Sequence, residues 1–192
     1  MAGFLFVISG PSGVGKGSII QGLLTRITDL SVSVSATTRP PRPGEINGVH
    51  YHFLKQEEFS RHIESGDFLE WVRVHGAYYG TPRQFLEKEL SAGKDIVLDI
   101  EVKGAKEVKK YFPDAISIFI IPPSLEELHN RLSNRKTENK YARSKRLARA
   151  EEELREMQEY DYIIVNEDLG KATREVCAII TAERRRNRQK KL

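Results

Sequence analysis

The sequence contains very little cysteine and no long apolar run. Among its 192 residues only Cys177 is a cysteine, so no disulfide can form within the chain. A membrane-spanning helix needs about 20 consecutive apolar residues, and no such run occurs. The first residues also lack the basic-then-apolar pattern of a secretory signal. We therefore expect no membrane association, a cytoplasmic location in a reducing environment, and Cys177 as a small buried side chain.

The chain also lacks an excess of positive charge outside its last ten residues. The formal net charge is +4 at pH 7. Residues 183–192 carry six basic residues and one acid, a net of +5, so the other 182 residues sum to −1. The basicity therefore belongs to the tail, which is typical of a solvated helix end, although a weak polyanion contact is an alternative. We expect no nucleic-acid partner, and the oligomeric state is not indicated.

Apolar runs and helical patterns alternate along the chain. Continuous apolar runs predict strands buried on both faces of a parallel sheet, over residues 4–9, 95–100, 115–121 and 162–165. Apolar residues at helical spacing predict helices over 17–27, 83–92, 102–110, 124–134, 144–159 and 171–186. This alternation predicts an α/β fold with a parallel core sheet, in a single domain spanning residues 1–192.

Two stretches interrupt the alternation. Residues 31–81 carry short alternating strand signals, such as Val32 and Val34, with Pro, Gly and His between them, which predicts an inserted α+β lobe. Residues 134–146 are polar and strongly basic, which predicts a short mobile lid. The core would then consist of residues 1–30, 82–133 and 147–192.

A glycine-rich segment lies between the first predicted strand and the first predicted helix. It reads Gly10-Pro11-Ser12-Gly13-Val14-Gly15-Lys16-Gly17-Ser18. Glycine lets backbone N–H groups turn inward around a polyphosphate, and Lys16 and the positive end of the following helix add attraction for the anion. An ordinary turn is the alternative, but the strand before and helix after favour an ATP-binding loop. Gly17 stands where a Ser or Thr usually meets Mg²⁺, so Ser18 is the expected metal contact.

A proline-rich segment offers a second site for a phosphate. In Arg39-Pro40-Pro41-Arg42-Pro43-Gly44 the prolines exclude helix and favour a polyproline-like conformation with three residues per turn. Arg39 and Arg42 would then lie on one side as a two-arginine clamp. A rigid solvated turn is the alternative.

Taken together, these segments resemble the guanylate kinases, the P-loop nucleoside monophosphate kinases that transfer the γ-phosphoryl group of ATP to GMP in purine nucleotide metabolism. The resemblance extends from Gly10 to Leu169 and rests on these stretches, in family order: GPSGVGKGS, SVSATTRPPRPGEINGVHYHF, FLEW, YYGTP, VLDIEVKGA, IFIIPPS, RLSNR, KRL and YIIVNEDL. It implies a three-layer P-loop NTPase fold with a parallel core sheet, an inserted α+β GMP-binding lobe at 31–81 and a short basic lid at 134–146.

The resemblance also assigns the GMP site. It implies that the GMP phosphate contacts Ser35, Arg39, Arg42, Tyr51 and Tyr79. It implies that the guanine lies against Glu70, Gly80, Thr81 and Glu101. The chemistry of the base agrees, because guanine presents two neighbouring N–H donors to a carboxylate, whereas adenine presents an acceptor that would be left unmatched. Without the resemblance, Glu70 would be read as a surface acid.

The remaining charged residues would serve ATP and its metal. Asp99 ends a predicted core strand, where ligands of such sheets bind, and we expect it to meet Mg²⁺ through water; a structural acid is the alternative. The resemblance makes Arg131, Arg135 and Arg146 the arginines that close over the phosphates, with Lys16 and Arg39 as their catalytic partners. It also places Asn166 near the adenine. The five histidines show no metal-ligand pattern.

Two other functions fit parts of this pattern. A kinase-like scaffold that binds protein partners would lose residues of the phosphate loop, and these are intact here. A kinase for another nucleotide or a sugar phosphate would lack the guanine-facing set of Glu70, Thr81 and Glu101, which is present. The sequence therefore favours transfer from ATP to GMP.

Overall fold

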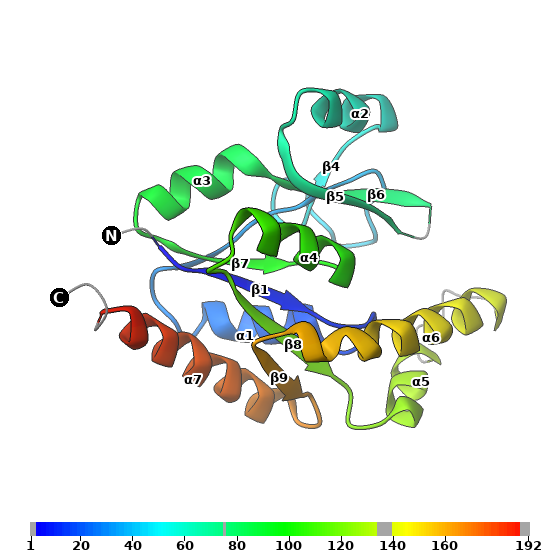
Figure 1. The fold of residues 1–192 in the computed structure, drawn as a ribbon. Coiled ribbons are helices and arrows are strands. Elements are labelled where there is room, and N and C mark those ends of the chain that lie inside the picture. Colours follow the sequence, from blue (N-terminus) through cyan, green and yellow to red (C-terminus); the bar gives the residue numbers. More distant parts are fainter. Residues whose placement is uncertain (1–2, 75, 134–139, 189–192) are drawn as a thin grey trace. The chain divides into compact units, whose positions relative to one another are not determined.

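The fold is known from a computed structural model, which describes residues 3–74, 76–133 and 140–188. The chain divides into two compact units. The first consists of Met1–Leu5 with Leu30–Ala115, and the second of Phe6–Asp29 with Ile116–Leu192. Figure 1 labels most elements of both. The predicted lobe and lid are smaller segments within these units, and their role as separate moving parts stays a prediction.

The first unit contains two sets of strands. A four-stranded sheet has the order β4-β3-β6-β5, and β2 pairs with β7 in a parallel arrangement. Its elements are β2 (Leu30–Val32), β3 (Ala36–Thr37), β4 (His52–Phe53), α2 (Gln56–Glu64), β5 (Phe68–Val74), β6 (Ala77–Pro82), α3 (Arg83–Ser91), β7 (Asp95–Asp99) and α4 (Val102–Tyr111).

A small apolar cluster supports the four-stranded sheet. Phe59 of α2 is fully buried and stacks on Phe68 of β5, with 4.5 Å between ring centroids. Ala36 completes the buried set, and Leu54, Ile63 and Tyr78 pack around it. The sheet is therefore held by its own apolar contacts, which is what an inserted lobe requires.

The second unit contains three parallel strands in the order β1-β8-β9. Its elements are β1 (Leu5–Ser9), α1 (Lys16–Leu24), β8 (Ile116–Ile121), α5 (Leu125–Ser133), α6 (Lys140–Arg155), the 3₁₀ turn η1 (Glu156–Glu159), β9 (Tyr162–Val165) and α7 (Leu169–Arg188). Helix α7 packs against α1.

Three of the four apolar runs form strands that are buried on both faces, as the sequence predicts, but in β9 only Ile164 is buried, and Ile163 and Val165 are each 44% exposed. Phe6, Val7 and Ile8 of β1 are fully buried, and so are Ile118, Phe119 and Ile120 of β8. Burial of consecutive residues means that both faces of each strand are covered, which is the property of a parallel core sheet. The prediction of an α/β fold with a parallel core is confirmed.

The structure differs from the sequence-based expectation at three further places. Residues 30–32 form β2, whose parallel partner is β7, with Val32 opposite Val97; the alternation of Val32 and Val34 had suggested a strand of the inserted lobe. Helix α6 begins at Lys140, inside the predicted lid, and its predicted end forms η1. Cys177 is half-buried rather than fully buried, and this burial raises the pKa of its thiol.

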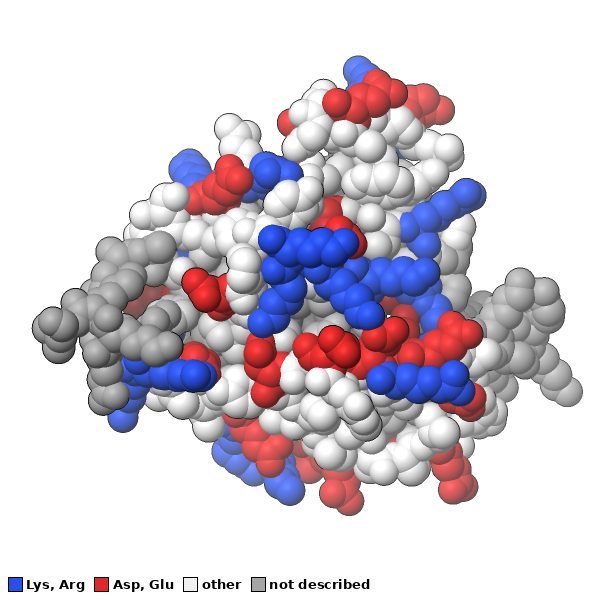
Figure 2. Space-filling view, in the orientation of Figure 1, with Lys and Arg blue, Asp and Glu red and all other residues white. Residues whose placement is uncertain are grey.

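The surface carries both signs of charge. On the face shown in Figure 2, basic side chains gather over α4, which holds four lysines and one acid, Glu107, and acidic side chains appear elsewhere on the surface. This mixture agrees with the near-neutral sum outside the tail. Within the described ranges, no helix combines the length and the apolar character that crossing a membrane requires.

Candidate active site

The glycine-rich loop between β1 and α1 has a backbone that only glycine tolerates well. Gly10, Gly13 and Gly15 have φ angles of 143°, 92° and 93°. A Cβ at Gly10 would also lie 2.2 Å from the carbonyl oxygen of Ile120. Because these positions are strained for other residues, the loop keeps the tight turn that a phosphate-binding loop needs.

Lys16 is the first residue of α1. Its Nζ donates a hydrogen bond to the Gly10 carbonyl oxygen at 2.7 Å, so the side chain folds back over the loop. The first turn of α1 contains no acidic residue, which leaves the positive end of the helix dipole uncompensated. Backbone, helix end and ammonium group thus combine into an anion site within the second unit.

Asn166 supports this loop directly, and Arg131 supports Asn166. Asn166 follows β9 and is 5% exposed, and its Nδ2 donates to the carbonyl oxygen of Val14 at 2.7 Å. Arg131 of α5 donates from Nη2 to the Asn166 carbonyl oxygen at 3.0 Å and from Nε to Glu127 at 2.8 Å. The side chain of Asn166 therefore supports the loop, a role that the sequence did not suggest, and its contact with adenine stays a prediction.

The Asn166→Ala variant should be less stable than the parent protein. The change leaves the buried Val14 carbonyl without its donor, which should lower the free energy of unfolding by about 1–3 kcal/mol. Urea denaturation measures this directly, with Asn130→Ala on the exposed face of α5 as the matched control. Equal stability of both variants would show that Asn166 does not hold the loop.

The residues expected at GMP all lie in the first unit, around the four-stranded sheet. Ser35 precedes β3, and Arg39 and Arg42 follow it. The others come from β6, the residue before β4, β5 and the N-cap of α4: Tyr79, Gly80, Thr81, Tyr51, Glu70 and Glu101. The strand register brings Thr37 opposite Tyr79, and Glu70 opposite Thr81.

Glu70 is a buried acid with one defined partner. It is 6% exposed, and its Oε1 accepts a hydrogen bond from Thr81 Oγ1 at 2.5 Å. The pKa of Glu70 is raised to about 7, mainly by burial; the Thr81 hydroxyl acts in the opposite direction, and the nearby carboxylates of Glu101 and Glu107 add to the rise. Glu70 is therefore an acid that is costly to ionise in the interior, and such groups are typical of functional sites.

Arg39, Tyr51 and Tyr79 form a second cluster among the residues expected at GMP. The Arg39 guanidinium carbon lies 5.3 Å from the centroid of the Tyr51 ring, and the rings of Tyr51 and Tyr79 are 6.1 Å apart. Burial raises the pKa of Tyr51 to about 12, so its phenol remains protonated and able to donate a hydrogen bond at neutral pH. These three side chains offer a cation and a phenolic donor to an anion.

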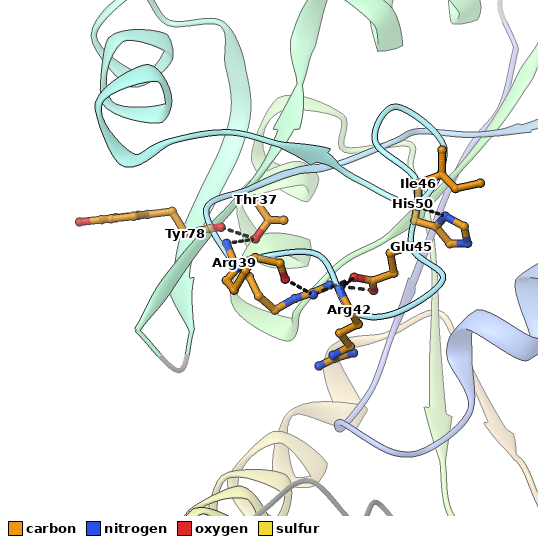
Figure 3. A network of polar contacts seen from close by, with 8 residues as sticks. Thr37, Arg39, Arg42, Glu45, Ile46, His50 and Tyr78 are labelled. Atoms are coloured by element: carbon orange, nitrogen blue, oxygen red, sulfur yellow. Dashed lines mark hydrogen bonds and ion pairs between the residues drawn. The ribbon is translucent and has the colours of Figure 1, made fainter.

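Glu45 is a member of this region that the sequence reasoning missed. Its carboxylate accepts from both terminal nitrogens of Arg39, at 2.8 and 2.9 Å, and from the backbone N–H of Arg42 at 2.6 Å. Figure 3 shows Arg39 directed toward Glu45, with the Arg42 side chain extending away from this pair. The loop turns at Pro43 and Gly44, so Glu45 returns to Arg39, and the spacing of the arginines alone does not reveal that contact.

The other predicted residues have a less defined environment. Asp99 ends β7 and is half-buried, and Ser18 lies exposed in α1. In the part of the chain that the structure covers, no three side chains of His, Cys, Asp or Glu come together as a metal site. Arg135 and the side chain of Arg146 fall outside the described residues.

The parallel core, the glycine-rich loop and the lysine at the start of α1 together define a protein of the P-loop nucleotide-binding class. Comparison with known proteins makes this more specific. The family model "Guanylate kinase" matches residues 3–183. The chain belongs to the guanylate kinase family, and this membership makes it an enzyme that transfers a phosphoryl group from ATP to GMP.

Individual relatives agree over nearly the whole length. A guanylate kinase of Symbiobacterium thermophilum is 51% identical over 184 residues, spanning 96% of this chain and 87% of that protein. One of Caldanaerobacter subterraneus is 49% identical over 182 residues, 95% of this chain and 88% of the relative. The crystal structure of guanylate kinase from Anaplasma phagocytophilum superimposes with a TM-score of 0.81 at 34% identity, covering 95% of this chain and 86% of that one.

Proposed function

We propose that residues 10–18 hold Mg·ATP and that the four-stranded sheet of the first unit holds GMP, so that the γ-phosphoryl group passes from ATP to GMP and gives ADP and GDP. The observation that carries this assignment is the buried Glu70 with its Thr81 partner. Burying an acid that is costly to ionise is explained if its carboxylate accepts hydrogen bonds from the N–H groups of guanine. The proposal also places the reaction in the cytoplasm, where a lone cysteine suits the reducing environment.

ATP would bind along the loop and the start of α1. Backbone N–H groups of the loop would surround the polyphosphate, and Lys16 would leave the Gly10 carbonyl to contact it. Asn166 would lie near the adenine, next to the loop that it supports. The ATP-binding set is Gly10, Pro11, Ser12, Gly13, Val14, Gly15, Lys16, Gly17, Ser18 and Asn166.

GMP would bind with its phosphate at the arginine–tyrosine cluster. Arg39 and Arg42 would supply positive charge, and the Tyr51 phenol would donate a hydrogen bond, as would Tyr79 and Ser35. The guanine base would lie against Glu70, Gly80, Thr81 and Glu101. Two neighbouring N–H groups of guanine suit a carboxylate, and adenine would leave that carboxylate without a donor.

The transfer itself requires no general base. The attacking atom is an oxygen of the GMP phosphate, which is already mostly ionised at neutral pH. The new bond forms from this oxygen to the γ-phosphorus while the bond to the bridging oxygen of ADP breaks, in line. Lys16 and Arg39, with Arg131, Arg135 and Arg146 from α5 and the proposed lid, would stabilise the charge on the transferred group and exclude water.

Magnesium would be held mainly by phosphate oxygens and water. Mg²⁺ keeps several waters and typically takes only one or two protein oxygens, which agrees with the absence of a cluster of ligating side chains among the described residues. Ser18 and Asp99 would meet it, Asp99 through water. When bound, the ion neutralises charge on the β- and γ-phosphates.

GMP binding should strengthen as the pH rises through about 7, because the carboxylate form of Glu70 is the one that accepts the guanine N–H groups. The raised pKa also means that Glu70 favours folding at low pH and that this contribution is lost as the pH rises from 4.5 to about 7. Calorimetric titration of GMP between pH 6 and 8.5 measures the dependence. The Glu70→Gln variant separates it from ionisation of the GMP phosphate, since only the step at the Glu70 pKa should disappear.

A coupled ADP-release assay tests the proposed function. Mg·ATP is offered with GMP, AMP, CMP and UMP in separate reactions. We expect rapid ADP formation with GMP and little with AMP. Activity with a different acceptor would refute the guanine site, and a folded protein that binds GMP without turnover would support the scaffold function instead.

A further inference from the structure

Gly104 is a buried glycine in the first turn of α4, which begins at Val102. Its φ angle is not in the left-handed region that favours glycine, so the backbone does not require a glycine at this position. Alanine is the better helix former, so helix propensity gives no reason for a glycine at this position. The reason for a glycine here must therefore lie in what surrounds it.

The neighbour of Gly104 is the carboxyl group of Glu70. Helix α4 packs against β5, which carries Glu70. A Cβ at position 104 would lie 2.5 Å from Oε2 of Glu70, 3.0 Å from its Cδ and 3.6 Å from Oε1. The three nearest atoms all belong to this one carboxyl group, and the first distance is shorter than real Cβ contacts allow. A side chain at position 104 would therefore occupy the space in which the Glu70 carboxyl group lies.

The carboxyl group is held on its other side as well. Oε1 accepts from Thr81 Oγ1 at 2.5 Å, on the neighbouring strand β6. Glu70 is 6% exposed, so a displaced carboxyl has little solvent to move into without losing this hydrogen bond. Thr81 fixes one oxygen, and the empty space above Gly104 accommodates the other.

We propose that Gly104 is a specificity-determining residue, because its missing side chain leaves the space in which the Glu70 carboxyl group is positioned to read guanine. This inference rests on the proposed function, and it adds to it a residue that does not itself contact the substrate through a polar group. A methyl group at 104 would push the end of a flexible side chain rather than the backbone. The fold should therefore survive the change, while the position of the carboxyl should not.

The test is a double-mutant cycle on GMP binding, followed by calorimetry. Gly104→Ala should weaken GMP binding by about 10- to 100-fold, the cost of misplacing a charge-assisted hydrogen-bond acceptor. In the Glu70→Ala background the clashing carboxyl is gone, so adding Gly104→Ala should cause no further loss. The affinity for ATP should change less than about twofold, since the substitution is confined to the base site.

Gly22→Ala serves as the matched control. Its Cβ would lie 2.9 Å from Thr173 Cγ2, so it also crowds a helix glycine, but at the contact of α1 with α7. It should leave GMP affinity unchanged. Thermal unfolding of every variant distinguishes a loss of binding from a loss of folding.

Three outcomes would overturn the inference. They are unchanged GMP affinity in Gly104→Ala, losses that simply multiply in the double variant, and a double variant that does not fold although Glu70→Ala does. If Gly104→Ala alone fails to fold, the double variant still tests the inference: it lacks the clashing carboxyl, so it should fold and bind GMP as Glu70→Ala does. Failure of the parent protein to bind GMP would instead refute the proposed function, so the two failures are distinguishable.

Discussion

Replacing Lys16 with alanine should lower kcat by about 10²- to 10³-fold, which corresponds to roughly 3–4 kcal/mol of lost transition-state stabilisation. Lys16 opens α1 and lies folded over the loop on the Gly10 carbonyl oxygen, at 2.7 Å. In the proposed reaction it is the cation that follows the charge developing on the transferred phosphoryl group. Steady-state kinetics at saturating ATP and GMP measures the effect.

The control for this variant is Lys171→Ala. Lys171 is an exposed lysine of α7 in the same unit, 4.0 Å from Glu175. It should leave kcat unchanged, and circular dichroism should show both variants folded. A Lys16→Ala enzyme that turns over near the parent rate would remove the loop lysine from the mechanism.

Replacing Glu70 with alanine should lower kcat/KM for GMP by about 10²- to 10⁴-fold, because two N–H donors of guanine lose a charged acceptor, each hydrogen bond being worth roughly 1.5–3 kcal/mol. The KM for ATP should change little, since Glu70 and Thr81 lie in the first unit and the glycine-rich loop lies in the second. The preference for GMP over AMP should fall in the same variant. Kinetics with each substrate varied in turn measures all three quantities.

Glu64→Ala is the comparison for this change. Glu64 is an exposed acid at the end of α2 in the same unit, so its removal alters the charge equally without touching the sheet. It should behave as the parent protein does. Equal losses for GMP and ATP in Glu70→Ala would show that this carboxyl does not read the base.

Most of the fold could be predicted because its signals are local. The core strands β1, β7 and β8 are largely apolar runs, such as residues 116–121, and these runs predict their burial, whereas β9 is an apolar run that stays mostly exposed. The glycine-rich loop is equally local, since three glycines and a lysine at fixed spacing specify both the backbone and the charge. The place of β2 beside β7 was not predicted, because three residues are too few to show a period and β7 is distant in the sequence.

The parts of the site that could not be predicted depend on contacts between residues that are not neighbours in the sequence. Asn166 supports Val14 across 152 positions, and no local pattern announces such a contact. Glu45 reaches Arg39 because the chain turns back at Pro43 and Gly44. Gly104 could not be recognised as informative until the carboxyl of Glu70 was found against it. In each case the residue type is unremarkable, and only the three-dimensional neighbour gives it a role.

One competition experiment tests the central claim most directly. Mg·ATP is mixed with GMP and AMP at equal concentrations, and all nucleotides are followed by phosphorus NMR. The account predicts that GDP and ADP appear in equal amounts while AMP is not consumed. ADP formed without GDP, or AMP consumed as fast as GMP, would contradict it.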